Sequence, residues 1–114
     1  MNLLLAALLA ITVDLRIIDG DTFVWHGETV RIANIDAPEL HGAKCEYELT
    51  LAIKATARLS TLLTAQPFEL VRLKRRDRYG RTLATVVVGE VDIGAQLVHE
   101  GLARPWRGRR YPWC

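Results

Sequence analysis

The sequence predicts an α+β protein that is mainly β: a small five-stranded barrel with one long and one short helix. Short strand-like runs recur between turn signals, and one long stretch has helical periodicity. The 114 residues fit one compact domain. Half of them are hydrophobic and a quarter are charged, which excludes a disordered tail, a collagen-like fibre and a coiled coil.

The first half of the chain predicts three strands. Apolar and polar residues alternate over residues 10–18, which is typical of a half-buried strand. Residues 22–25 and 29–35 are rich in β-branched and apolar residues, and a tight turn over residues 26–28 separates them. Pro38 breaks the third strand because proline has no N–H to donate.

The long helix is predicted over residues 45–64, which contain no Gly or Pro and are rich in Ala, Leu, Lys and Glu. Helical spacing places six residues on its apolar face: Leu49, Ala52, Ile53, Thr56, Leu59 and Leu63.

Two further strands, over residues 67–73 and 82–88, flank a basic turn at residues 74–81. A short helix over residues 93–100 would be capped by Asp92 and end before Gly101. Five short strands and two helices in this order fit the oligonucleotide-binding barrel, although order alone does not establish it.

Residues 1–9 are uncharged and nearly all apolar. The apolar run is too short to span a bilayer, so we expect no stable membrane insertion. It is either a short export signal, although a positively charged start is missing, or an apolar extension of the first strand.

Charge is distributed unevenly along the chain. Residues 1–57 hold 4 Lys/Arg against 8 Asp/Glu, whereas residues 58–114 hold 11 against 5. This distribution is either an uneven solvated surface or an acidic pocket for a cation beside a basic surface for polyanions.

Five polar residues interrupt or end the apolar strands. Taken singly, each has a structural explanation as a turn, cap or ion-pair residue. Together they supply what phosphodiester hydrolysis needs: carboxylates for calcium or magnesium, arginines for phosphate oxygens, and a carboxylate to orient water. They are Asp21, Arg31, Asp36, Glu39 and Arg81.

Several motifs resemble the staphylococcal nuclease family, in the family's order, across residues 13–104. They are Asp-Gly-Asp-Thr at 19–22, Val-Arg-Ile at 30–32, Asp-Ala-Pro-Glu at 36–39, Asp-Arg-Tyr-Gly-Arg at 77–81, Leu-Val at 97–98 and Gly-Leu-Ala at 101–103. The resemblance implies an oligonucleotide-binding barrel over residues 10–104 and a calcium-dependent nuclease acting on DNA or RNA.

The resemblance also implies residue roles. Asp21, Asp36 and the backbone carbonyl of Ala37 would bind calcium, Arg31 and Arg81 would hold the phosphate, and Glu39 would be the general base. Arg78 and Tyr79 match positions near the bound nucleotide. The alternative is a non-catalytic nucleic-acid-binding module of the same fold. The presence of all the carboxylates and arginines favours the enzyme.

The basic turn and the C-terminal tail are candidates for nucleic-acid contact. Lys74, Arg75 and Arg76 would form a phosphate-contacting edge, or merely a solvated hairpin tip. The tail, residues 105–114, interleaves arginines with aromatic residues, which suits either stacking on bases or packing on the barrel.

Cys45 and Cys114 are too few, even with His41, for a structural zinc site. A bridge between them would pin the tail to the long helix and would require an oxidising compartment. We therefore expect a secreted or periplasmic monomer, or a cytoplasmic one if residues 1–9 are not an export signal.

Overall fold

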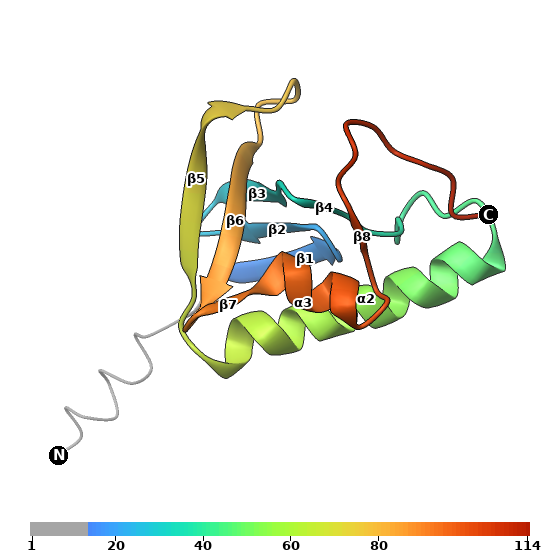
Figure 1. Ribbon diagram of the computed structural model, residues 1–114, viewed down its shortest axis with the longest axis horizontal. Helices are drawn as coiled ribbons and strands as arrows, with labels where there is room; N and C mark the ends of the chain where they lie inside the picture. Colours follow the sequence, from blue (N-terminus) through green and yellow to red (C-terminus); the bar gives the residue numbers. More distant parts are fainter. Residues whose placement is uncertain (1–13) are drawn as a thin grey trace, which may run out of the picture.

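The computed structural model describes residues 14–114. Its main sheet orders five strands as β1-β2-β3-β6-β5, with the short β7 paired to β6 (Figure 1). These strands are β1 (Leu15–Asp19), β2 (Thr22–Trp25), β3 (Glu28–Ile32), β5 (Glu69–Arg76), β6 (Thr82–Val88) and β7 (Val91–Asp92). A separate small sheet joins β4 (Ile35–Asp36) to β8 (Arg104–Pro105).

The predicted fold class is confirmed: residues 14–114 are mainly β, with five principal strands and two helices in the order of an oligonucleotide-binding barrel. One pairing in the main sheet is parallel, that of β3 with β6. The chain passes through the long helix and β5 between them, so it enters β6 in the same direction as β3.

The long helix α2 (Glu46–Ala65) begins one residue after its predicted start, with Cys45 at the N-cap position. Its buried face includes Ala52, Leu59 and Leu63. Leu49 and Ile53 are 39% and 54% exposed, so their assignment to the buried face was wrong. The helix is rotated so that these two positions lie at the margin of the face that packs on the sheet.

Two predicted strand boundaries need correction. The strand expected over residues 29–35 is divided by a turn at residues 33–34, so that β4 leaves the main sheet and pairs with β8. The strand expected over residues 67–73 continues to Arg76, which pairs with Thr82 of β6. Lys74, Arg75 and Arg76 therefore lie on β5, and only residues 77–81 form the turn.

Most of the remaining described elements agree with the sequence, although the two-residue strands β7 and β8 were not predicted. Strands β2 and β6 have the predicted bounds, and β1 covers the latter part of the run predicted over residues 10–18, of which 10–13 lie outside the described residues. The short helix α3 (Ile93–His99) is capped by Asp92, which accepts a 2.9 Å hydrogen bond from the Ala95 N–H. The core packs both helices against the sheet around Phe23, Ile32, Leu59, Ile93 and Leu97.

The C-terminal segment returns to the start of α2 (Figure 1). It leaves β8 and ends at Cys114, whose sulfur is joined to that of Cys45 in a disulfide. This is the pair expected from the sequence. Among residues 14–114, no helix combines the length and the apolar character that crossing a bilayer requires.

Candidate active site

The turn between β1 and β2 brings the first site residue into the interior. A Cβ atom at Gly20 would lie 2.8 Å from the Cβ of Ala55 and 2.9 Å from that of Ala37. Only glycine therefore lets this turn pack against α2 and the segment after β4. Asp21, the next residue, is fully buried as a result.

Asp21 and Asp36 are buried carboxylates with different degrees of hydrogen bonding. Asp21 accepts hydrogen bonds of 2.8 Å from the Thr22 hydroxyl and from the Ala37 N–H. Asp36 is 3% exposed, and its Oδ1 atom has no hydrogen-bond partner. A buried carboxylate oxygen without a donor is costly, so Oδ1 of Asp36 is the least satisfied atom of the site.

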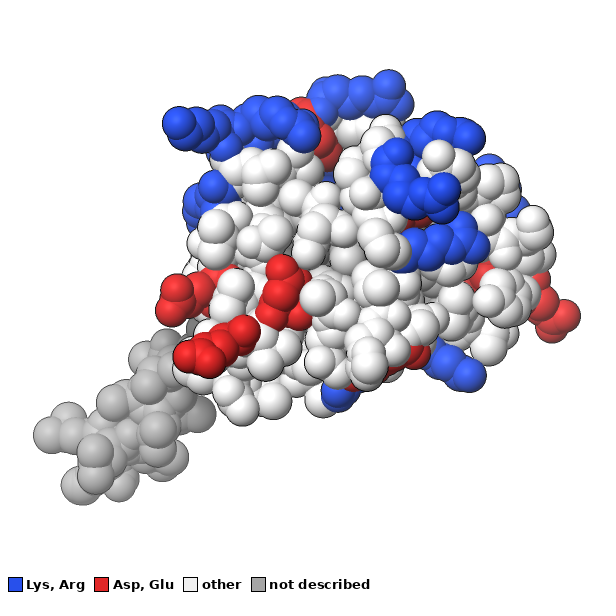
Figure 2. Space-filling model, in the orientation of Figure 1, with Lys and Arg blue, Asp and Glu red and all other residues white. Residues whose placement is uncertain are grey.

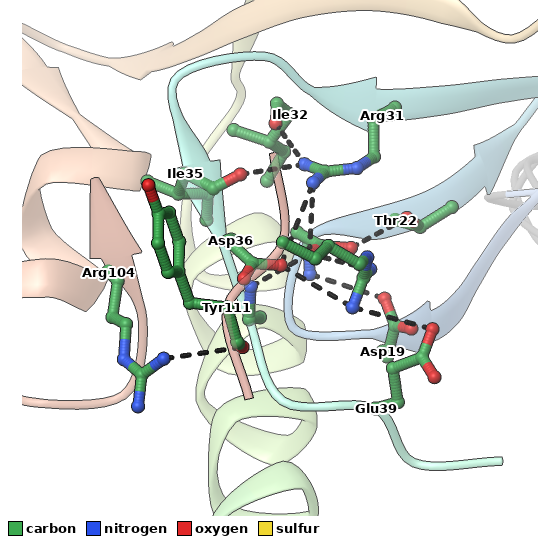
Figure 3. Close-up of polar contacts among 12 residues, drawn as sticks. Asp19, Thr22, Arg31, Ile32, Ile35, Asp36, Glu39, Arg104 and Tyr111 are labelled. Atoms are coloured by element: carbon green, nitrogen blue, oxygen red, sulfur yellow. Dashed lines mark hydrogen bonds and ion pairs between the residues drawn. The ribbon is translucent and has the colours of Figure 1, made fainter. Parts of the chain in front are cut away.

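Arg31 on β3 links the two carboxylates (Figure 3). Its Nη2 atom lies 3.5 Å from Oδ2 of Asp21 and 3.9 Å from Oδ1 of Asp36. Its Nη1 atom donates hydrogen bonds to the carbonyl oxygens of Ile32 and Ile35. At 6% exposure the guanidinium is fixed by these contacts, as a buried charge must be.

Glu39 lies in the loop after β4, and its side chain is 40% exposed. Glu48, which the sequence analysis missed, orders this loop: its carboxylate accepts hydrogen bonds from the N–H groups of Glu39 (3.1 Å) and Lys44 (2.9 Å). Glu48 is the third residue of α2 after the N-cap Cys45. This position in the sequence could have indicated the role of Glu48, because an acidic side chain at the third helical position commonly accepts hydrogen bonds from N–H groups that precede the helix.

Asp19 is a further carboxylate, to which the sequence motifs assigned no role of its own. Burial and the nearby Asp21 charge raise the pKa of Asp19 to about 7. Burial also raises the pKa of Asp36, although Arg110 opposes this increase. The signal for Asp19 was the Asp-Gly-Asp doublet, which places two carboxylates on one tight turn.

Arg110 from the C-terminal tail lies among the carboxylates. Its guanidinium is within 3.7 Å of Asp21, 3.4 Å of Asp36 and 3.4 Å of Glu39. Partial burial lowers the pKa of Arg110, but the surrounding carboxylates outweigh burial and raise it. Nothing in the sequence pattern indicated this placement, because it depends on the path of an irregular segment.

Beside the carboxylates lies a cavity of about 540 Å³. The predicted phosphate residues Arg31 and Arg81 both line it. Arg81 is oriented by Asp77, whose Oδ2 atom accepts a 2.6 Å hydrogen bond from its Nε. The predicted nucleotide residues Arg75, Arg78 and Tyr79 also line the cavity, as do the tail residues Trp106, Arg109 and Arg110. Lys74 and Arg76 do not.

The basic residues of the second half of the chain gather on this part of the molecule. Figure 2 shows Lys and Arg side chains along the end of the β5–β6 hairpin and over the C-terminal segment. The cavity lies between these two regions, since β5, the following turn and the tail all contribute to its lining. The surface is therefore electrostatically suited to a polyanion.

The described residues contain no group of three or more His, Cys, Asp and Glu side chains arranged as a metal cage. Asp21 and Asp36 nevertheless suit a hard divalent cation. Both supply carboxylate oxygens, one of these oxygens is buried without a hydrogen bond, and two more carboxylates lie nearby. With only two buried carboxylates as ligands, a metal site here would bind its cation weakly and would leave coordination positions open.

The buried carboxylates, the buried arginine and the basic cavity of this small barrel are chemically suited to a phosphate ester. The family model described as "Staphylococcal nuclease homologue" matches residues 29–112. The chain therefore belongs to the staphylococcal nuclease family, as the sequence motifs indicated.

Curated proteins support the same family. The chain is 36% identical over 95 residues to a thermonuclease of Staphylococcus intermedius, covering 78% of this chain and 55% of that protein. It is 36% identical over 103 residues to the endonuclease YncB of Bacillus subtilis, covering 85% of this chain and 48% of that protein. An uncharacterized endonuclease of Haemophilus influenzae is 35% identical over 101 residues, and the match covers 84% of this chain and 51% of that protein. The chain thus spans about half the length of the curated relatives it matches.

Proposed function

We propose that this protein is a calcium-dependent nuclease that hydrolyses phosphodiester bonds of DNA, RNA or both. The observation that carries the proposal is the position of Arg31. It is buried between two carboxylates and also lines the basic cavity, so one residue joins a cation-binding region to a phosphate-binding region. The names of the relatives, thermonuclease and endonuclease, support the same activity.

Asp21, Asp36 and the Ala37 carbonyl would hold calcium, which when bound supplies positive charge to the phosphate. Arg31 and Arg81 would donate hydrogen bonds to the phosphate oxygens and stabilise the charge that develops on them. Glu39, half-exposed at the edge of the site, would orient the attacking water and accept its proton. Arg75, Arg78 and Tyr79 would bind the flanking nucleotides, and Lys74 and Arg76 would add charge along β5.

The Cys45–Cys114 disulfide supports the proposal that the protein acts in an oxidising compartment, since disulfide bonds persist in secreted and periplasmic proteins. We extend the proposal to that localisation and to a monomer. Export itself would be checked by fractionating cells that express the protein from its own gene.

The test is cleavage of single-stranded DNA, double-stranded DNA and RNA by the purified protein, with calcium and with a chelator. We expect cleavage with calcium, none with chelator, and recovery when calcium is restored. Asp21→Asn should abolish the recovery, because it removes charge from a buried ligand. Asp14→Asn, which changes an exposed carboxylate before β1, is the matched control and should cleave normally.

Undiminished cleavage after thorough metal removal would contradict calcium dependence. Binding of all three nucleic acids without any cleavage would favour the alternative, a non-catalytic binding module.

A further inference from the structure

Arg110 makes ion pairs with the carboxylates on which the proposed calcium site depends. Its Nη1 atom lies 3.4 Å from Oδ1 of Asp36 and 3.4 Å from Oε1 of Glu39, and its Nη2 atom lies 3.7 Å from Oδ2 of Asp21. No other part of the tail makes an ion pair with Asp21 or Asp36 in the described structure. A cation supplied by the chain itself therefore neutralises the carboxylates proposed to bind the metal.

These contacts differ from those of a well-formed arginine–carboxylate pair. Such pairs commonly form two parallel hydrogen bonds of about 2.8 Å. Here, among residues 14–114, no hydrogen bond joins the Arg110 guanidinium to the three carboxylates, and Oδ1 of Asp36 stays without a donor despite two arginines nearby. Arg110 supplies charge without satisfying the oxygens. A smaller ion that these oxygens could contact directly would satisfy them better.

The tail is fixed on both sides of Arg110. On one side, β8 pairs with β4, the strand that carries Asp36. On the other, Cys114 is bonded to Cys45 at the start of α2. Arg104 connects the two sides, since its Nη1 atom donates a 3.1 Å hydrogen bond to the Pro112 carbonyl and its guanidinium lies 3.6 Å from the Trp113 ring centroid. The segment is thus closed into a loop that holds Arg110 close to the carboxylates.

We propose that Arg110 is an intramolecular competitor of the metal ion, that it sets the metal affinity of the site, and that the Cys45–Cys114 disulfide keeps it in place. The inference rests on the proposed calcium site. Metal binding requires Arg110 to leave Asp21 and Asp36, so the apparent affinity equals the intrinsic affinity multiplied by the fraction of molecules in which the arginine is displaced. The displaced guanidinium remains beside the cavity that it already lines.

The test is calcium titration by calorimetry in the absence of nucleic acid. Arg110→Gln should bind calcium about tenfold more tightly than the wild type, because a unit charge a few ångströms from a divalent ion is removed. The matched control is Arg107→Gln, which removes the same charge from an arginine that lies over the Tyr111 ring, 4.5 Å from its centroid. Its calcium affinity should stay within about twofold of the wild type.

Cys114→Ser tests the tether. Freeing the end of the tail lowers the local concentration of the competing guanidinium, so this variant should bind calcium more tightly than the wild type but less tightly than Arg110→Gln.

Equal calcium affinity in the wild type and Arg110→Gln would overturn the inference while leaving the proposed calcium site intact. Calcium binding by neither protein would overturn both. If Arg110→Gln does not fold, the Arg110 side-chain signal of the wild type can be followed by NMR during a calcium titration. We expect that signal to shift with saturation, and an unmoved signal in a protein that binds calcium would overturn the inference.

Discussion

Arg81 illustrates how a single side chain is prepared for phosphate binding. Asp77 accepts a hydrogen bond from its Nε atom, and the other oxygen of Asp77 accepts hydrogen bonds from the N–H groups of Tyr79 and Arg81. These bonds lower the pKa of Asp77 in spite of its partial burial. One edge of the guanidinium is therefore held by the turn, while its two Nη atoms stay available to a ligand in the cavity.

Arg81→Lys should lower the turnover number about 100- to 1,000-fold with the fold retained, the usual effect of removing a donor that acts on developing charge. Lysine cannot bind Asp77 and present two parallel donors at once. Steady-state cleavage measures the effect, and the circular dichroism spectrum checks the fold. Arg16→Lys, at an exposed position of β1, is the control. Wild-type turnover in Arg81→Lys would show that Arg81 does not act on the phosphate.

At the scale of elements, Glu28 connects three strands. From β3 it forms an ion pair with Arg72 of β5 and accepts a hydrogen bond from the Thr82 hydroxyl of β6. The hydrogen bonds from Arg72 and Thr82 lower the pKa of Glu28 from 4.5 to about 2. The folded state therefore favours the ionised carboxylate.

Because the pKa of Glu28 is lower in the folded state, acid should reduce the stability that this carboxylate contributes. The stabilisation is present above pH 4.5, the unfolded-state value, and is lost as the pH falls toward 2, because the unfolded chain then binds the proton more readily. Glu28→Gln should unfold at lower urea concentration at pH 6, and its stability should decline less between pH 5 and pH 3. Glu69→Gln, on the exposed end of β5, is the control. Parallel declines in wild type and Glu28→Gln would contradict the assignment.

The basic residues of β5 should differ in their contribution to nucleic-acid binding. Arg75 lines the cavity, whereas Lys74 does not. Arg75→Gln should reduce the slope of log K against log salt for a single-stranded oligonucleotide by about 0.7, the value for one phosphate contact, and Lys74→Gln should reduce it less. Fluorescence anisotropy at several salt concentrations measures both. Equal slopes in the two variants would show that the cavity lining does not define the binding path.

Strands and helices were predictable because their periodicity and turn signals are local. Asp92 and Gly101 delimit α3 as expected. The exposure of Leu49 and Ile53 was not predictable, because the rotation of an amphipathic helix depends on its partner surface. The extension of β5 to Arg76 was not predicted either, because the basic residues 74–76 indicated a turn. Pairing with β6 stabilises an extended conformation there instead.

The site residues that lie on the barrel strands and the adjoining loops could be predicted from the sequence, whereas the site residue in the C-terminal tail could not. Motif resemblance named Asp21, Arg31 and Asp36, which the structure brings together. Arg110 reaches the same carboxylates through an irregular segment whose path depends on β8 and the disulfide. No periodicity or motif encodes such a path.

At the scale of the whole molecule, the disulfide closes much of the chain into a loop, because its two cysteines have a sequence separation of 69. The chain-entropy model gives about 4 kcal/mol of stabilisation for such a loop, an upper value because strain in the folded state subtracts from it. Cys114→Ser should therefore lower the free energy of unfolding in urea by up to that amount. Labelling in denaturant should find no free thiol in the wild type before reduction and two afterwards.

Thiols that label without reduction in the purified wild type would contradict the bridge. An unchanged free energy of unfolding in Cys114→Ser would instead show that the bridge adds no stability.

In the proposed function, Arg31 lies between the two buried carboxylates and stabilises the phosphate during hydrolysis. The most direct measurement is the single-turnover cleavage rate of Arg31→Lys at saturating calcium, with oligonucleotide affinity measured separately in chelator. We expect a rate about 100- to 1,000-fold below that of the wild type, with affinity changed only a few-fold, because the missing donors act mainly on charge that develops during the reaction. A rate close to that of the wild type would show that Arg31 does not stabilise the reacting phosphate.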